Sequence, residues 1–254
     1  MTARTPVAVV TGGSGGLGAA ICTRLAAEGL RVVLTYRSGE EAAHRVVEEI
    51  AAAGGPTARA VRVDLTDEGH VARVLREVAD AEGGVDVLVH AAGPHVPMVH
   101  LSRVEPADMT RQLLADSAAF FSVVHALLPS LRSTAGAVVA VTTAATARYP
   151  KRDGLSSAPK AAVEALVRGF AAEEGRYGVR FNAVGPGMLT DGMAERLITS
   201  GELDDAALEI TRRNIPLNRF GNAADIAEAV AFLASDRAGF ITGQKLDVDG
   251  GYGV

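Results

Sequence analysis

Apolar residues along this chain fall in short β-branched runs that alternate with longer stretches of helical periodicity. Several runs, such as "VAVV", "VDVLV" and "AVVAV", are almost wholly apolar, which is typical of strands that helices cover on both faces. Seven strands are predicted, at Val7–Thr11, Arg31–Tyr36, Ala58–Val63, Val85–His90, Ala137–Thr142, Val179–Val184 and Lys245–Val248. Helices are predicted between them, at Gly16–Glu28, Glu40–Ala53, Glu68–Ala81, Asp108–Arg132, Ser157–Arg176 and Ala223–Ala234.

This alternation of strand and helix predicts an α/β fold, a single Rossmann-type doubly wound parallel sheet with right-handed crossovers and helices on both faces. No repeat or linker interrupts it, so residues 1–254 are predicted to form one dinucleotide-binding domain. Residues 185–220 lack strand signals, and charged helical pieces at about 188–214 predict a lid over a pocket. The alternative is a surface insertion with no role in binding.

Local signals predict where three helices begin. Ser38 followed by Glu41 fits a capping box for the second helix. Asn222 is a suitable N-cap for the last one. Pro159 is tolerated only in the first turn of a helix, so the helix that carries it is predicted to begin near Ser156 or Ser157.

Composition narrows the class of partners. Hydrophobic residues make up 48% of the chain and charged residues 22%, which supports a substantial core. The net charge of −5 argues against a nucleic-acid or anionic-membrane partner. A cytoplasmic location is expected by default, because the chain shows no signal-peptide pattern and no membrane span. The single cysteine, Cys22, excludes an intrachain disulfide and is predicted to be a small core residue.

A glycine cluster follows the first strand directly. The segment "TGGSGGLG" runs from Thr11 to Gly18 and opens the first helix. Gly12, Gly16 and Gly18 are spaced for a tight turn, a close approach to a pyrophosphate and close helix–strand packing. The helix N-terminus adds unpaired N–H groups that favour phosphate. The position of the cluster therefore predicts a dinucleotide site, against the alternative of a merely structural turn.

The end of the second strand predicts which dinucleotide binds. A protein that prefers NAD(H) usually carries an acidic residue there for the ribose 2′-hydroxyl, but Tyr36 occupies that position. Arg37 and Ser38 follow, and a guanidinium with a hydroxyl suits a 2′-phosphate. NADP(H) is therefore favoured over NAD(H). The alternative is that Arg37 is a solvated surface charge.

These motifs resemble those of the short-chain dehydrogenase/reductase superfamily, and most closely its 3-oxoacyl-[acyl-carrier-protein] reductase-like branch. The resemblance extends through "VDLTD", "HAAG", "GPGML" and the C-terminal "ITGQKLDVDGGYGV", and so covers essentially the whole chain. It implies NAD(P)H-dependent carbonyl reduction or alcohol oxidation and assembly as a homotetramer or dimer through the two long helices. The cofactor-binding residues that the motifs and the resemblance indicate are Gly12, Ser14, Gly15, Gly16, Leu17, Gly18, Tyr36, Arg37, Ser38, Asp64, Leu65, Ala91, Ala92, Gly93, Lys160, Pro186, Gly187 and Leu189.

The chain departs from the family at the catalytic positions. The resemblance implies a set of Asn, Ser, Tyr and Lys, whose tyrosine donates a proton to the carbonyl oxygen as hydride arrives. The matching positions here are Asp116, Thr143, Ser156 and Lys160, so only the lysine is retained. Thr143 keeps a hydroxyl. Ser156 is a poor general acid near neutrality, because an aliphatic hydroxyl is far less acidic than a phenol with a pKa near 10.

Asp116 adds a carboxylate near Lys160. It is predicted either to form an ion pair with that ammonium or to act as an acid if burial favours its neutral form. The substrate side is predicted to involve His95, Arg148, Tyr149 and Met188. The cationic loop around Tyr149 suits an anionic or carrier-bound substrate, with a solvated surface loop as the alternative. Three nearby histidines have no usual ligand spacing, so no metal site is predicted.

Three functions remain open at this point. The first is an NADP(H)-dependent oxidoreductase that reduces a carbonyl, imine or enone of a small or carrier-bound metabolite by a proton path without the tyrosine. The second is a non-redox enzyme, such as a cyclase, dehydratase or lyase, on the same scaffold. The third is a catalytically silent NADP(H)-binding partner subunit.

Overall fold

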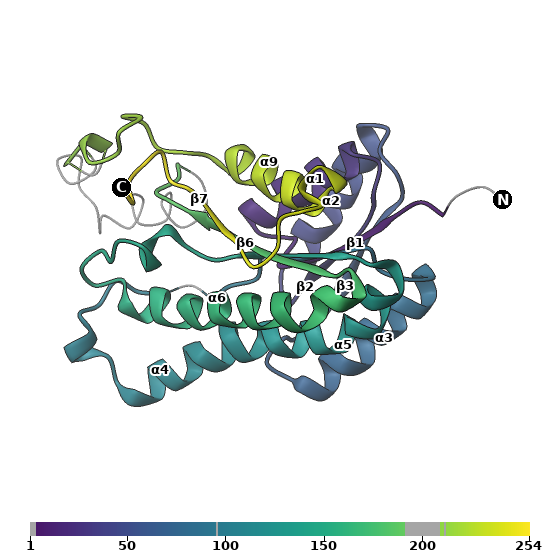
Figure 1. Cartoon of the computed structure of the whole chain (residues 1–254), viewed down its shortest axis with the longest axis horizontal. Coiled ribbons are helices and arrows are strands. Elements are labelled where there is room, and N and C mark those ends of the chain that lie inside the picture. Colours follow the sequence, from purple (N-terminus) through teal and green to yellow (C-terminus); the bar gives the residue numbers. More distant parts are fainter. Residues whose placement is uncertain (1–3, 95, 191–208, 211) are drawn as a thin grey trace.

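Seven parallel strands form the central sheet of the protein, seen in the computed structural model of Figure 1. The structure describes residues 4–94, 96–190, 209–210 and 212–254. The strands are β1 (Val7–Thr11), β2 (Arg31–Tyr36), β3 (Ala58–Arg62), β4 (Val87–His90), β5 (Ala137–Val141), β6 (Arg180–Pro186) and β7 (Lys245–Val248). Their order in space is β3-β2-β1-β4-β5-β6-β7. The predicted α/β fold with a doubly wound parallel sheet is confirmed.

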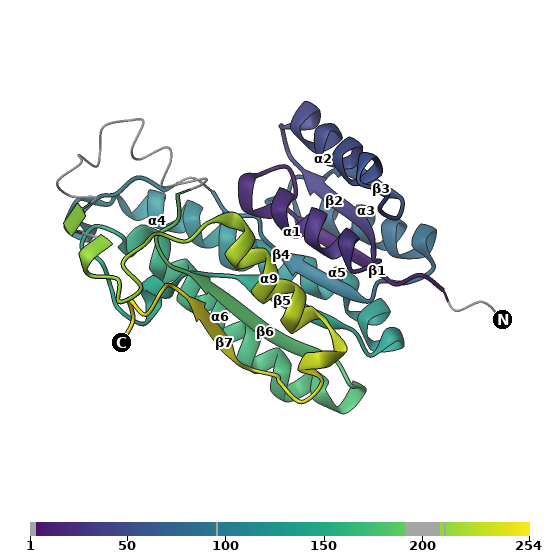
Figure 2. The same ribbon diagram turned by 90° about the horizontal axis from the view of Figure 1, so that it is seen from above.

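Helices cover both faces of this sheet (Figures 1 and 2). One face carries α1 (Gly16–Ala27), α2 (Glu40–Ala52) and α9 (Ala223–Ala234). The other carries α3 (Glu68–Glu82), α5 (Ala119–Thr134) and α6 (Gly154–Glu174). Alternation along the strands supplies both cores, because side chains of successive strand residues point to opposite faces.

The strand β1 shows how the two cores are filled. Val7 and Val9 belong to the core on the α3–α5–α6 side, whereas Ala8 and Val10 belong to the core on the α1–α2–α9 side. Cys22 of α1 is fully buried in the second core. The prediction that it is a small core residue is confirmed.

The strand order reverses between β1 and β4, which lie side by side and run parallel. The connections from the two halves of the sheet therefore leave in opposite directions at the carboxyl ends of these strands. Ligands of such open sheets bind in the crevice outside that point. The glycine cluster after β1 and the segment "HAAG" that ends β4 both lie there.

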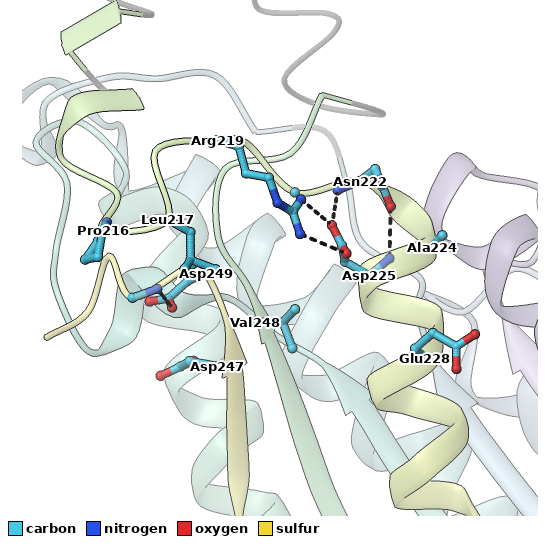
Figure 3. A pocket seen from close by; sticks show the side chains of 13 residues that line it. Pro216, Leu217, Arg219, Asn222, Ala224, Asp225, Glu228, Asp247, Val248 and Asp249 are labelled. Carbon is cyan, nitrogen blue, oxygen red and sulfur yellow. Dashed lines mark hydrogen bonds and ion pairs between the residues drawn. The ribbon is translucent and has the colours of Figure 1, made fainter.

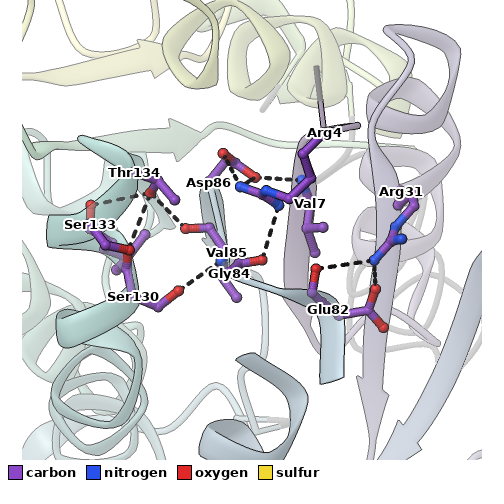
Figure 4. A network of polar contacts seen from close by, with 11 residues as sticks. Arg4, Val7, Arg31, Glu82, Gly84, Val85, Asp86, Ser130, Ser133 and Thr134 are labelled. Atoms are coloured by element: carbon purple, nitrogen blue, oxygen red, sulfur yellow. Dashed lines mark hydrogen bonds and ion pairs between the residues drawn. The ribbon is translucent and has the colours of Figure 1, made fainter. Parts of the chain in front are cut away.

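The opposite edge, at the amino ends of the strands, is closed by polar contacts (Figure 4). Arg4 pairs with Asp86 at 2.7 Å, and the same carboxylate accepts a hydrogen bond from the backbone N–H of Val7 at 2.7 Å. The hydroxyl of Thr134 donates to the carbonyl of Val85 at 2.8 Å. These contacts hold α5 and the N-terminal segment to the sheet, which leaves the carboxyl ends as the place for a site.

The prediction of one continuous helix over Asp108–Arg132 is wrong. This stretch is divided into α4 (Pro106–Leu113), a π-helical segment (Leu114–Ala118) and α5. The π turn adds one residue per hydrogen-bonded ring, which a hydrophobic pattern does not reveal, and such turns are frequent at functional sites. Asp116 lies inside it and is buried.

One stretch, Pro106–Thr134, is long and apolar enough to cross a membrane by length and composition alone. Phe120, Val124 and Leu127 of this stretch are fully buried against the sheet. Leu114 and Phe121 of the same stretch are exposed, so packing against the sheet buries only part of its apolar surface.

The three predicted helix starts agree with the structure to different degrees. The predicted N-cap at Asn222 is confirmed, with its side chain accepting from the N–H of Asp225 as part of a capping box. The capping box at Ser38 is wrong, because α2 begins after Gly39 and no side chain caps it. The helix α6 begins at Gly154, earlier than expected, because the carbonyl of Asp153 already accepts the first helical hydrogen bonds. Pro159 is therefore the sixth helical residue.

Most of the expected lid at about 188–214 lies outside the described residues, which resume only at 209–210 and 212. At its near end, Leu189 forms a parallel bridge with Gly221, so the chain that follows β6 is tied to the segment before α9.

Candidate functional site

The glycine cluster forms a tight turn against the segment that follows β4. Gly12 has a φ of +68°, a left-handed conformation that favours glycine. A Cβ on Gly12 would lie 2.7 Å from the Cα of Ala92, so no side chain fits between these two loops. The two segments that the sequence assigned to the dinucleotide therefore meet at the switch point of the sheet.

Gly18 sets the close packing of α1 on this turn. A Cβ on Gly18 would lie 2.1 Å from the carbonyl oxygen of Gly12. The helix begins at Gly16 after Gly15, and no side chain of the described residues caps it. Its first N–H groups are thus free to bind phosphate, which is what a dinucleotide site of this type requires.

The end of β2 differs from expectation in one respect. Tyr36 is buried, and the carboxylate of Glu40 is close enough to affect the pKa of its hydroxyl. Burial, followed by Glu40, raises the pKa of this phenol. A carboxylate does reach this end of the strand, carried by the first residue of α2. Nothing in the strand pattern pointed to Glu40, since it lies four residues beyond the position where the acid is sought.

Two guanidinium groups lie beside that end of the strand. The Nε of Arg62 donates to the carbonyl of Arg37 at 3.1 Å. The pKa of Asp64 is lowered by its hydrogen bonds with Thr66 and also by the charge of Arg37. Arg62 was not among the expected site residues, although it is the direct partner of Tyr36 in the β2–β3 register.

Ser14 of the glycine loop approaches the turn before α2. A Cβ on Gly39 would lie 3.4 Å from the Oγ of Ser14. The loop after β1 and the loop after β2 are therefore neighbours, and a group bound at Arg37 and Ser38 would lie between them.

Lys160 occupies the centre of the expected catalytic set. Its ammonium lies 3.0 Å from the Oδ1 of Asp116 and donates to the carbonyl of Val141 at 3.2 Å. Both charged side chains are largely buried, and of the two roles predicted for Asp116 the structure shows the ion pair. A Cβ on Gly93 would lie 3.5 Å from the Nζ atom of Lys160, which places this ammonium next to "HAAG" as well.

The segments that carry the other catalytic candidates pack around α6. Thr143 follows β5 in an extended conformation, and its Oγ1 accepts from the N–H of Ala145 at 3.1 Å. Ser156 lies in the first turn of α6 and is half-buried. The π-helical segment that carries Asp116 contacts α6 directly, and the hydroxyl of Ser117 donates to the carbonyl of Pro159 at 2.9 Å.

The substrate candidates are spread more widely. Tyr149 is 57% exposed. Arg148 donates to the carbonyl of Tyr252 at 2.9 Å and lies 4.7 Å above its ring, so it holds the C-terminal loop. The carbonyl of Met188 accepts from the N–H of Gly221 at 3.0 Å. His95 lies outside the described residues.

A hollow of about 680 Å³ opens between the start of α9 and the loop after β7 (Figure 3). Its rim includes Arg219, which pairs with Asp225 at 3.0 Å and thereby holds the helix N-terminus. Four carboxylates line it, those of Asp225, Glu228, Asp247 and Asp249, against one guanidinium. This excess of negative charge does not suit an anionic dinucleotide.

His90 ends β4 inside the crevice and is fully buried. Its Nδ1 lies 3.0 Å from the hydroxyl of Thr11, and its Nε2 has no hydrogen-bond partner among the described residues. Burial, aided by the charge of Lys160, lowers the pKa of His90 from 6.5 to about 3. The imidazole is therefore neutral at physiological pH. In the described part of the chain, no group of three or more His, Cys, Asp and Glu is placed to hold a metal ion.

This buried imidazole predicts acid sensitivity. The unfolded chain takes up a proton on His90 near pH 6.5, whereas the folded chain does so only near pH 3. Stability is therefore complete above pH 6.5 and falls as the pH drops through that window. We expect His90 to contribute a loss of about 2 kcal/mol in the free energy of unfolding between pH 7.5 and pH 5.

Urea unfolding of the wild type and of His90→Asn at the two pH values measures this contribution. His44→Asn, on the exposed face of α2, is the control and is expected to retain the wild-type pH dependence. An unchanged pH dependence in His90→Asn would contradict the prediction.

Comparison with known proteins places this site in a known family. A family model described as enoyl-(acyl carrier protein) reductase matches residues 12–253. A 3-oxoacyl-[acyl-carrier-protein] reductase FabG of Staphylococcus epidermidis is 36% identical over 245 residues, which are 96% of this chain and 97% of the relative. Versicolorin reductase 1 of Aspergillus parasiticus is 32% identical over 251 residues, with 96% and 95% coverage.

Solved structures agree with these relatives. A short-chain dehydrogenase from Burkholderia cenocepacia in complex with NADP is 32% identical, with a TM-score of 0.89 over 99% of this chain and 100% of that one. A dehydrogenase/reductase from Sinorhizobium meliloti is 35% identical, with a TM-score of 0.89 over 99% and 96% of the two chains. With its glycine turn at the switch point and its buried lysine on α6, the chain belongs to the short-chain dehydrogenase/reductase superfamily of oxidoreductases, in the branch similar to 3-oxoacyl-[acyl-carrier-protein] reductases.

Proposed function

We propose that the protein is an NADP(H)-dependent oxidoreductase that reduces a carbonyl, imine or enone of a small or carrier-bound metabolite. Its proton path lacks the family's tyrosine. The proposal rests on one observation, that the glycine turn for the dinucleotide and the catalytic lysine are both retained. The glycine turn leaves no room for side chains at Gly12 and Gly18, and the buried ammonium of Lys160 lies beside Gly93.

The residues present fit a dinucleotide. The uncapped N-terminus of α1 and the side-chain-free turn suit a pyrophosphate. We propose that Lys160 and the turn at Pro186 and Gly187 hold the nicotinamide end, and that Asp64 and Leu65 border the adenine. When bound, the dihydronicotinamide supplies a hydride.

The chain's own side chains then have separable tasks. Asp116 holds the ammonium of Lys160 in place through their 3.0 Å contact. The hydroxyl of Thr143 accepts from the N–H of Ala145 and keeps its own proton for donation to a substrate oxygen. Ser156 stands where a proton must be delivered, but its hydroxyl is too weak an acid to act alone.

Relatives and the surface support the substrate class. The Staphylococcus relative is named as a reductase of 3-oxoacyl groups bound to a carrier protein. The loop before α6 carries Lys151 and Arg152, both exposed, which suits an anionic or carrier-bound substrate. Assembly as a homotetramer or dimer through α5 and α6, and a cytoplasmic location, remain predictions.

Consumption of NADPH, followed by its absorbance, tests the proposal on a panel of 3-oxo thioesters, activated ketones, enones and cyclic imines. Substrate-dependent oxidation of NADPH supports it. Product formation without dinucleotide would favour the non-redox alternative. Tight binding of NADPH without turnover on any probe would favour the silent partner subunit.

The choice of dinucleotide gives a separate prediction. Replacing Arg37 with alanine is expected to weaken NADPH binding about 10-fold or more, because a charge-assisted contact with the 2′-phosphate contributes roughly 1.5–3 kcal/mol. NADH binding is expected to change little. Fluorescence titration with both dinucleotides measures the two affinities.

Glu40→Gln on the same loop is the matched control. It removes a negative charge beside Tyr36 and is expected to preserve or strengthen NADPH binding. Equal effects of Arg37→Ala on NADPH and NADH would show that Arg37 does not read the 2′-phosphate.

A further inference from the structure

The residue before α6, Asp153, has a carboxylate that the helix does not use. Its backbone carbonyl accepts the N–H groups of Ser156 at 3.0 Å and Ser157 at 2.9 Å, and also the hydroxyl of Ser157 at 2.9 Å. Its side chain makes no capping hydrogen bond, although it occupies the N-cap position. An aspartate at that position normally caps its helix, so this carboxylate is left for another role.

The helix places this carboxylate in line with the catalytic candidates. Asp153 is the N-cap residue directly before α6, with φ −94° and ψ 4°, and its carbonyl accepts the first hydrogen bonds of the helix. Residues three, four and seven positions apart share a helix face. Asp153, Ser156 and Lys160 therefore follow one another along one side of α6. In the order of the chain, Ser156 lies between Asp153 and Lys160 on this side.

Burial allows this carboxyl group to keep its proton at a higher pH than an exposed aspartate does. Leu101 covers the first turn of α6, since a Cβ on Gly154 would lie 2.6 Å from its side chain. Burial raises the pKa of Asp153 from 3.8 to about 6. Lys151 and Arg152, which precede Asp153 in the chain, are both exposed. A group whose pKa lies near the working pH is well suited to proton transfer.

The chain is strained directly before this residue. Arg152 has a φ of +72°, in the left-handed region that a side chain disfavours. Such a conformation costs about 1 kcal/mol or more and persists where the surrounding structure requires it, often at functional sites. Here it turns the cationic loop into α6 at the residue that presents the carboxylate.

We propose that Asp153 supplies the proton that the missing tyrosine would otherwise donate, acting through the hydroxyl of Ser156. The inference rests on the proposed function. Reduction adds hydride to the carbonyl carbon and leaves an alkoxide on its oxygen. The proton of the Ser156 hydroxyl passes to that oxygen, and the carboxyl proton of Asp153 replaces it. The resulting carboxylate is reprotonated from solvent. A serine hydroxyl can accept and donate at once, as this relay requires.

The test is the pH dependence of NADPH oxidation, with ethyl acetoacetate and acetoacetyl-CoA as probes. The wild-type kcat is expected to fall as the pH rises through about 6. Asp153→Asn is expected to lower kcat about 50-fold or more and to abolish this fall of kcat with rising pH, with NADPH affinity unchanged. Asp153→Glu is expected to restore part of the activity and the fall of kcat with rising pH. Asp236→Asn, an exposed carboxylate far along the chain, is the control and is expected to behave as wild type.

A variant with its own proton donor distinguishes this catalytic role of Asp153 from a structural one. Ser156→Tyr is expected to restore a direct phenolic donor, so adding Asp153→Asn to it should cost little. A 50-fold loss in the double variant would overturn the relay. Carbon-13 NMR of labelled aspartate gives a reading independent of turnover. A carboxyl signal that titrates near pH 6 is expected in the wild type and is expected to be absent from Asp153→Glu.

The remaining outcomes are also distinct. Unchanged kcat and pH profile in Asp153→Asn would overturn this inference and leave the proposed function standing. Failure of the wild type to oxidise NADPH with every probe would defeat the proposed function, and this inference with it. Should Asp153→Asn not fold, the NMR titration decides, and an ordinary aspartate pKa of about 3.9 would overturn the inference.

Discussion

Replacement of Lys160 with methionine is expected to lower kcat/KM at least about 100-fold, or about 2.7 kcal/mol of transition-state stabilisation. The substitution removes the ammonium beside Gly93 and with it the proposed hold on the nicotinamide ribose. It also leaves Asp116 buried without its ionic partner, which lies 3.0 Å from the lysine. An unpaired buried charge of this kind costs about 3–5 kcal/mol. Steady-state kinetics and urea unfolding of the same variant measure both effects.

The two effects can be separated with a second substitution. Asp116→Asn in the Lys160→Met background removes the uncompensated charge. The double variant is expected to regain most of the lost stability while remaining inactive. If it regained activity as well, Lys160 would act only by stabilising the fold. If Lys160→Met unfolded no more easily than wild type, the ion pair would contribute nothing to stability.

Replacement of Gly18 with alanine is expected to destroy the dinucleotide site. The new Cβ would lie 2.1 Å from the carbonyl oxygen of Gly12 and 2.8 Å from the Cα of Gly13. Both neighbours are backbone atoms, so α1 must move away from the turn. Overpacking of this kind costs about 1–3 kcal/mol. NADPH affinity is expected to fall at least about 100-fold, measured by fluorescence titration.

Gly15→Ala is the matched control in the same loop. Its Cβ would have one neighbour, the carbonyl oxygen of Gly12, at an ordinary contact distance of 3.5 Å. Thermal unfolding of this variant is expected to match the wild type. Wild-type NADPH affinity in Gly18→Ala would show that the turn does not bind the dinucleotide.

Much of the architecture was predictable because it depends on local periodicity. The start and end of β1 and β2 were predicted to the residue, and α2 ended one residue before the predicted Ala53. The glycine cluster was also predictable as a turn, because few other residues tolerate the φ of +68° at Gly12. A uniformly apolar strand indicates that both of its faces are covered, and an apolar stripe along a helix indicates the side that packs on the sheet. The strand order is restricted because crossover connections are right-handed.

The catalytic region was predictable only in part. Counting along the motifs brought Asp116 and Lys160 into one site, and the structure confirmed their contact. The π turn that carries Asp116 could not be foreseen, because it leaves no mark on the hydrophobic pattern. Arg148 was expected at the substrate, yet it contacts Tyr252, which is 104 residues away along the chain.

The sequence by itself determined the layered sheet, the place of the crevice and the absence of a tyrosine at position 156. The tertiary structure alone decided the surroundings of each ionisable group. Glu40 raises the pKa of Tyr36, His90 is held neutral by burial and by the charge of Lys160, and burial raises the pKa of Asp153. The physical reason is that backbone conformation follows from residues close in the chain, whereas the acidity of a side chain depends on desolvation and on charges brought near it by segments far apart in the chain.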